Sequence, residues 1–206
     1  MWYSRASMRY ERKNIAAMHG YVPGKQPAAT DVVKLNTNEN PYPPSAAVMD
    51  ALRSIEPDAL RRYPKPAADG LRAAAARLHG LAPEQVVAVN GGDELLRLAV
   101  TTFVEPGAPI GVATPSYSLY PVLAELHGSP LVEVPLQDDW SLPSDLGPRM
   151  KRAGVQLLML VNPHAPSGHL TEVARLAALA RELSCVLLLD EAYVDFVDPE
   201  RGHDVV

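Results

Sequence analysis

Short apolar runs alternate with stretches of helical periodicity through the second half of the chain. The clearest run, Val186 to Leu189, holds four apolar residues without alternation and leads into Asp190. Such a run is typical of a strand buried on both faces, as in a parallel sheet covered by helices. It predicts that Asp190 lies at the carboxyl end of a core strand, where open α/β sheets bind their ligands.

A carboxylate at that position needs a partner, because an unpaired charge away from water is costly. We therefore expect Asp190 to meet a cation. Two structural alternatives stay open at this point: Asp190 caps the turn that follows it, or it pairs with a structural arginine.

The rest of the pattern predicts a regular alternation of strands and helices. Two early helices, at residues 46–55 and 70–79, have Ser45 and Asp69 as expected N-caps. This rhythm predicts an α/β fold with a doubly wound, mostly parallel sheet. The further strands are expected at residues 86–89, 110–113, 131–134 and 155–161, and the further helices at residues 93–104, 118–126 and 171–183.

Composition narrows the class of protein. The 206 residues are 47% hydrophobic and 21% charged, which is ordinary for a globular enzyme. The net charge of −5, without a dense basic run, argues against nucleic acid as the main partner. The single cysteine, Cys185, leaves no disulfide framework or zinc cluster and fits a reducing, cytoplasmic setting. No apolar run approaches the roughly 18 residues that span a membrane, and residues 1–14 lack the apolar core of a secretory signal.

Two glycines mark a candidate anion site. The sequence VVAV leads into NGGDELLRLAV, so Gly91 and Gly92 lie at a predicted strand-to-helix turn, where the helix N-terminus presents its N–H groups. The spacing is not that of a dinucleotide fingerprint. The alternative is that both glycines only allow a tight turn, with Asp93 as the cap.

An aromatic residue is expected at the same edge of the sheet. Tyr117, in the sequence ATPSYSLY, follows a predicted strand and Pro115. Its ring could stack on a planar heterocycle, or it could simply pack against its neighbours.

Four motifs in this order resemble the large domain of the fold-type-I pyridoxal-phosphate aminotransferases. They are GGDE, the aromatic residue after Pro-Ser, the turn VNPHAPSG and the segment DEAY. The likeness is greatest to the histidinol-phosphate aminotransferase group and covers nearly all of residues 15–198. It implies a three-layer αβα fold, with residues 1–35 as an arm of the small domain and residues 36–206 as an incomplete coenzyme-binding large domain. It also implies an aminotransferase of histidine biosynthesis that moves an amino group between an amino acid or histidinol phosphate and a 2-oxo acid.

The resemblance assigns roles to individual residues. The backbone at Gly92 and Asp93 would hold the phosphate of pyridoxal 5'-phosphate, Tyr117 would lie against its ring, and Tyr193 would donate to its phenolic oxygen. Asp190 would pair with the protonated ring nitrogen. Opposite charges about 4 Å apart attract by roughly 4 kcal/mol at an effective dielectric near 20, which favours the protonated, electron-withdrawing ring.

Three further matches concern the substrate and a second subunit. Tyr21, in HGYVPG, resembles a substrate-side tyrosine, and Asn40, in NENPYPPS, resembles the substrate entry loop. Tyr63, in RRYP, resembles a tyrosine that reaches the coenzyme phosphate of the partner subunit, which implies a homodimer. For each of the three, packing at the surface is the alternative.

The turn VNPHAPSG departs from the family pattern. An asparagine directly before Pro-Thr-Gly would donate to the phenolic oxygen, but Ala165 stands there, with Ser167 in place of threonine. Asn162 matches only an outer position of the motif. Either Tyr193 serves the oxygen alone or His164 reaches it; the alternative is that His164 is a solvated loop residue.

The lysine that forms the Schiff base in this family follows the DEAY segment, and none of the five lysines here follows Asp190. We therefore expect an N-terminal fragment with open sheet edges and no transaminase turnover by itself. Two other functions stay open: a pyridoxal-phosphate decarboxylase or lyase similar to threonine-phosphate decarboxylase, and a binding protein of this fold without catalysis. The lysines are Lys13, Lys25, Lys34, Lys65 and Lys151.

Overall fold

The computed structural model describes residues 10–19, 32–34, 36 and 38–201. The chain divides into two compact units, one made of Met1–Tyr21 with Val89–Val206 and the other of Val22–Ala88. The boundary expected from the sequence, between an arm of residues 1–35 and a large domain of residues 36–206, stays a prediction.

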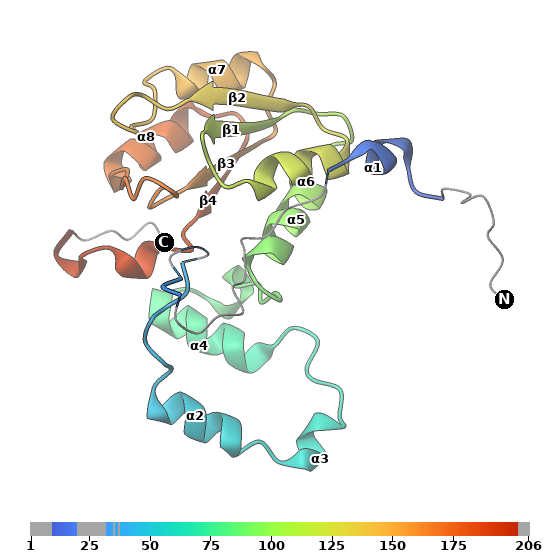
Figure 1. Cartoon of the computed structure of the whole chain (residues 1–206), viewed down its shortest axis with the longest axis vertical. Helices are drawn as coiled ribbons and strands as arrows, with labels where there is room; N and C mark the ends of the chain where they lie inside the picture. The colour runs from blue at the N-terminus through green and yellow to red at the C-terminus, as the bar shows by residue number, and fades with distance from the viewer. Residues whose placement is uncertain (1–9, 20–31, 35, 37, 202–206) are drawn as a thin grey trace. The chain divides into compact units, whose positions relative to one another are not determined.

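The larger unit is built on a parallel sheet. Among the described residues four strands lie in the order β2-β1-β3-β4, as Figure 1 shows. Ile110 pairs with Leu131 on one side and with Leu157 on the other, and Leu157 pairs with Val186. The carboxyl ends of the strands therefore meet at one edge. The strands are β1 (Ile110–Thr114), β2 (Leu131–Pro135), β3 (Leu157–Val161) and β4 (Val186–Asp190).

Helices cover both faces of this sheet because successive strand residues point to opposite sides. On β3, Leu157 and Met159 join a core with α5 (Gly92–Phe103) and α6 (Leu119–His127). Leu158 joins a second core with α7 (Leu146–Arg152) and α8 (Val173–Glu182). The predicted doubly wound parallel sheet in three layers is confirmed.

Helix α7 was not expected from the sequence. Gly147 and Pro148 interrupt the pattern, but both stand in the first turn, where proline is tolerated. A Cβ on Gly147 would lie 2.9 Å from Cβ of Glu182, so the glycine allows α7 to approach α8 closely.

The strand expected at residues 86–89 is wrong. The backbone at Val86 is extended (φ −112°, ψ 129°), but in the described part of the chain these residues belong to no sheet. A strand needs a neighbour for its N–H and C=O groups, and the carbonyl of Val86 instead accepts a hydrogen bond of 2.7 Å from Nε of Arg72.

The expected burial of β4 on both faces is also wrong. Val186 is 38% exposed, and the other four residues of β4 are half-buried. The reason is that β4 has only β3 as a neighbour among the described residues. Asp190 therefore stands at the end of an edge strand.

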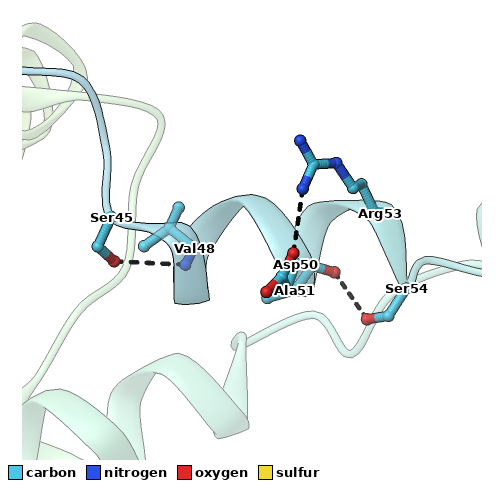
Figure 2. A network of polar contacts seen from close by, with 6 residues as sticks. All are labelled: Ser45, Val48, Asp50, Ala51, Arg53 and Ser54. Atoms are coloured by element: carbon cyan, nitrogen blue, oxygen red, sulfur yellow. Dashed lines mark hydrogen bonds and ion pairs between the residues drawn. The ribbon is translucent and has the colours of Figure 1, made fainter.

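The smaller unit is helical where it is described, with α2 (Ala46–Arg53), α3 (Pro57–Leu60), α4 (Asp69–His79) and the 3₁₀ helix η1 (Pro83–Gln85). Ser45 caps α2 as predicted, since its Oγ accepts a hydrogen bond from the backbone N–H of Val48 at 3.4 Å (Figure 2). The cap predicted at Asp69 is wrong. Asp69 is the first helical residue, preceded by Ala68 at φ 49°, and it pairs with Lys65 at 3.3 Å.

The segment before the smaller unit, within the residues expected to form an arm, holds a short helix, α1 (Lys13–Ala17). Two hydrogen bonds attach this segment to α6. Nη2 of Arg12 donates to the carbonyl of Leu126 at 2.7 Å, and Nδ2 of Asn14 donates to that of Glu125 at 2.9 Å. After β4 the chain forms the 3₁₀ helices η2 (Val194–Phe196) and η3 (Pro199–Arg201).

Candidate active site

The ends of β1, β3 and β4 bring the predicted site residues to one edge of the sheet. Val161 is opposite Asp190 in the β3–β4 ladder, and the N–H of Asn162 donates to the carbonyl of Asp190 at 2.9 Å. The two strands therefore end level, with Asp190 as the last residue of its strand.

The carboxylate of Asp190 accepts two hydrogen bonds from the described part of the chain. The hydroxyl of Tyr120 donates to Oδ2 at 3.0 Å, and the N–H of Ala192 donates to Oδ1 at 3.2 Å. The second bond bears out the turn-capping alternative. The described partners are a tyrosine and a backbone N–H rather than an arginine, and the cation expected opposite Asp190 stays a prediction.

Tyr117 lies between this carboxylate and the start of α5. Its hydroxyl donates to Oδ1 of Asp93 at 3.2 Å, and its ring meets that of Tyr120 edge to face, with centroids 5.7 Å apart and planes at 85°. A continuous series of contacts thus runs from Asp93 through Tyr117 and Tyr120 to Asp190. Three of these four residues were predicted from the sequence.

Tyr120 was missed. It is fully buried, with 0% exposure, in the core beneath α6. Burial raises the pKa of its hydroxyl far above the ordinary 10.0, and the neighbouring charge of Asp190 and the hydrogen bond to it add to the effect. The hydroxyl therefore keeps its proton and remains a donor. The sequence signal was weak: Tyr120 is a second tyrosine three residues after Tyr117, inside the helix expected at residues 118–126.

The start of α5 has the geometry of an anion site. Gly91, at φ 87° and ψ 165°, has a backbone conformation that favours glycine, and a Cβ on Gly92 would meet no described atom within 4 Å. Two acidic side chains of the first turn are held by other groups: Asp93 by Tyr117, and Glu94 by the N–H of Asn90 at 2.6 Å. The first backbone N–H groups of this 12-residue helix can thus serve an anion.

His164 is 7% exposed, so the expectation of a solvated loop residue is wrong. Its Nε2 lies 2.8 Å from the carbonyl of Pro115, which can only accept, so Nε2 donates. Nδ1, 2.7 Å from Oγ of Ser167, then accepts a hydrogen bond from that hydroxyl. Its ring is 5.7 Å from that of Trp140. Both ring nitrogens serve protein partners, and they tie the loop after β3 to the loop that carries Tyr117.

Asn162 also has a structural place. It is 1% exposed, its Oδ1 accepts from the N–H of Thr171 at 2.8 Å, and its Nδ2 donates to the carbonyl of Thr171 at 3.2 Å. These bonds close the loop between β3 and α8. Ala165, where the family pattern has an asparagine, is half-buried and packs against the core that contains Tyr120.

The remaining predicted site residues lie elsewhere or outside the described residues. Tyr193 is half-buried, three residues after Asp190. Tyr63 and Asn40 belong to the smaller unit; Tyr63 is fully exposed, and Oδ1 of Asn40 accepts a hydrogen bond of 2.9 Å from the N–H of Tyr42. Tyr21 lies outside the described residues. The roles of all four stay predictions.

The described residues show neither a metal centre nor a membrane-spanning helix. They contain no group of three or more His, Cys, Asp or Glu side chains that could hold a metal ion. None of their helices has both the length and the apolar character needed to cross a membrane.

Comparison with known proteins gives a consistent result. The family model described as aminotransferase class I and II matches residues 30–205. A histidinol-phosphate aminotransferase of Rhodopirellula baltica is 44% identical over 192 residues, which are 93% of this chain and 52% of that protein. One from Trichormus variabilis is 40% identical, with 96% of this chain and 55% of that protein covered. The chain spans about half the length of the curated relatives it matches.

Solved structures agree with the sequence relatives. The histidinol-phosphate aminotransferase from Sinorhizobium meliloti, in complex with pyridoxal-5'-phosphate, matches with a TM-score of 0.82 and 28% identity, covering 95% of this chain and 54% of that one. A single mutant of Thermus thermophilus aspartate aminotransferase matches with a TM-score of 0.72 and 26% identity, covering 90% and 54%.

Proposed function

This chain belongs to the class I and II aminotransferases, and we propose that the whole protein is a pyridoxal-phosphate-dependent enzyme. It moves an amino group between histidinol phosphate, or another amino acid or amine of this class, and a 2-oxo acid. The observation that carries the proposal is the series of contacts from Asp93 through Tyr117 and Tyr120 to Asp190. Histidinol phosphate is the proposed amino donor because two relatives, 44% and 40% identical to this chain, are histidinol-phosphate aminotransferases.

The residues present fit the coenzyme. The N-terminus of α5, at Gly92 and Asp93, offers backbone N–H groups to a phosphate. Tyr117 offers an aromatic face to the ring, and Asp190 offers a carboxylate to the protonated ring nitrogen, an attraction of roughly 4 kcal/mol at about 4 Å and an effective dielectric near 20. When bound, the coenzyme supplies an electron sink for the carbanion that forms at the substrate.

The side chains described here would hold and orient the coenzyme. Asp190, fixed by Tyr120 and by the N–H of Ala192, presents a negative charge in one orientation. Tyr117 closes the site on the side of α5. We assign to Tyr193 the hydrogen bond to the phenolic oxygen. Ala165 cannot donate, and both nitrogens of His164 are engaged by protein groups.

The substrate side and the second subunit are part of the proposal. Tyr21 and Asn40 would line the entry for small amino-acid and 2-oxo-acid substrates, on the arm and the loop that follows it. Tyr63 would reach the coenzyme phosphate of a partner subunit in a homodimer, and its full exposure supports this role. The lone cysteine supports a cytoplasmic location.

The test uses the protein made from the complete gene, loaded with pyridoxal 5'-phosphate. Histidinol phosphate and 2-oxoglutarate are supplied, and formation of glutamate is measured. We expect turnover that requires both substrates, and a loss of about 100-fold or more in kcat for Asp190→Asn, because the charge at the ring nitrogen is removed. Asp138→Asn is the matched control: it makes the same change on an exposed loop.

Other outcomes would identify other functions. Release of carbon dioxide without any need for the 2-oxo acid would show a decarboxylase or lyase of the same fold. Binding of the coenzyme without turnover of any amine and without a covalent adduct would show a binding protein. Either result would overturn the aminotransferase proposal.

A further inference from the structure

A hydrogen bond between two residues that lie 70 positions apart joins α6 to the end of β4. The hydroxyl of Tyr120 donates to Oδ2 of Asp190 at 3.0 Å. Tyr120 is 0% exposed and packs in the core between α5, α6 and the sheet. Its ring is further restrained by the edge-to-face contact with Tyr117. The donor thus has a fixed position, whereas Asp190 is half-buried on a strand with one neighbour among the described residues.

The two hydrogen bonds on Asp190 use one oxygen each. Tyr120 occupies Oδ2, and the N–H of Ala192 occupies Oδ1. A carboxylate has about four lone-pair positions, so about two stay available for a further donor. Two donors on different oxygens also fix the rotation of the carboxylate about its Cβ–Cγ bond. The available positions therefore have a defined direction.

We infer that Tyr120 is a positioning residue of the site: it holds the carboxylate of Asp190 in the orientation that receives the protonated ring nitrogen of the coenzyme. The inference rests on the proposed function, because it assumes that Asp190 meets this nitrogen. It adds a residue that the motif around Asp190 does not contain. It also explains why a hydroxyl is buried at this point of the core, where phenylalanine would fill the same space without needing a partner.

The chemistry of a phenol suits this role. Burial, and then the charge of Asp190, raise the pKa of the Tyr120 hydroxyl above its ordinary value. Tyr120 therefore keeps its proton over the whole range in which an enzyme works. The orientation of Asp190 does not vary with pH, as it would with a histidine donor.

The test measures binding of pyridoxamine 5'-phosphate, which has the ring nitrogen and the phosphate of the coenzyme but no carbonyl group. Its affinity is therefore independent of any lysine nucleophile. The probe is titrated calorimetrically into the protein from the complete gene, as wild type, Tyr120→Phe, Asp190→Asn and the double variant. Tyr120→Phe keeps the ring that fills the core, and near-ultraviolet circular dichroism checks that it folds.

We expect Tyr120→Phe to weaken binding about 10-fold when Asp190 is present and less than about 3-fold in the Asp190→Asn background, since hydrogen bonds to a charged group are the stronger ones. Tyr117→Phe is the matched control, because it removes a hydroxyl from the neighbouring ring that donates to Asp93. Its effect should be the same in both backgrounds.

The outcomes separate the inference from the proposed function. An equal loss of affinity for Tyr120→Phe in both backgrounds would mean that Tyr120 only stabilises α6, and would overturn the inference while the proposed function stands. A wild-type protein that does not bind pyridoxamine 5'-phosphate would overturn the proposed function and the inference together.

Discussion

Strands β3 and β4 have nearly the same composition, LLMLV and VLLLD, but very different surroundings. All five residues of β3 are buried, and none of those of β4 is. Strand β3 pairs with β1 and β4, whereas β4 pairs only with β3 among the described residues. Two apolar runs of similar composition thus form strands that differ in burial, because the number of neighbouring strands determines how deeply a strand is buried.

The same contrast divides the site. The loop after β3 carries Asn162 and His164, which are 1% and 7% exposed and bound to backbone and side-chain groups of the chain. The end of β4 carries Asp190, which is half-buried and has two hydrogen bonds. Buried polar groups with protein partners give rigidity. The loop after β3 is therefore fixed by protein partners, and the end of β4 presents a charge.

The largest expected effect compares two leucines that face each other across the β3–β4 ladder. Leu158 is 0% exposed and Leu187 is half-buried, and both contact the same core. Leu158→Ala should lower the free energy of unfolding by about 2–5 kcal/mol, as buried leucines do. Leu187→Ala should cost about half as much or less, because less of its surface is removed from water. Urea unfolding of the 206-residue chain measures both.

Equal losses would break the comparison, since they would show that β4 is covered in solution by something the described residues do not provide. The same two variants can be measured in the protein from the complete gene. If Leu187→Ala there lowers the free energy of unfolding as much as Leu158→Ala does, β4 is an interior strand in that protein.

The second prediction concerns the other interior strand, β1. A Cβ on Gly111 would lie 2.4 Å from Sδ of Met150 and 3.1 Å from Cγ1 of Val155. Gly111→Ala should therefore cost about 1–3 kcal/mol of stability through overpacking. The control is Gly70→Ala in α4, where a Cβ would meet no described atom within 4 Å. It should be neutral or stabilising by up to about 1 kcal/mol. Thermal melts of both variants check the difference, and an unchanged melt for Gly111→Ala would contradict it.

Much of the sheet could be predicted from local pattern alone. Short, mostly apolar runs placed β1, β2 and β4 within a residue of their observed ends, because such a run is a local property. Residues 86–89, VVAV, have the same property and still form no strand in the described chain. A strand needs a second segment to pair with, and the periodicity of its own residues does not show which segment lies beside it.

The site shows the same limit. Asp190 and Tyr117 were proposed from their places at the end of an expected strand and just after one, and Asp93 from its place at an expected helix start, while the family resemblance supplied their roles. The contacts of Tyr120 with Asp190 and of His164 with Pro115 were not predicted, because they join residues 70 and 49 positions apart along the chain. Only the folded structure brings those groups together.

The third prediction uses the buried contact between α6 and the edge strand. Below the ordinary pKa of 10.0 for tyrosine, folded and unfolded states both keep the Tyr120 proton, and its contribution to stability is complete. Above it only the unfolded state loses the proton, since burial raises the folded pKa. The free energy of unfolding should then fall by up to about 1.4 kcal/mol per pH unit.

Urea unfolding between about pH 9.5 and 11.5 measures this slope. Tyr120→Phe should remove that part of the decline, whereas Tyr42→Phe, at a residue 80% exposed, should leave it unchanged. Identical slopes for wild type and Tyr120→Phe would show that Tyr120 is reached by solvent, and that the edge strand is not held by a buried contact.

The smallest effect concerns Cys185, the residue before β4. Its thiol is half-buried, and burial raises its pKa, so less thiolate is present at pH 8 than in the unfolded chain. Alkylation by iodoacetamide should be several-fold slower in the folded chain than in urea, yet faster than global unfolding, because an edge position opens locally. Leu187→Ala should speed the reaction by loosening β4. If alkylation instead proceeds only at the rate of global unfolding, the start of β4 is as well protected as β3. The contrast between the two strands would then be limited to the end of β4 that carries Asp190.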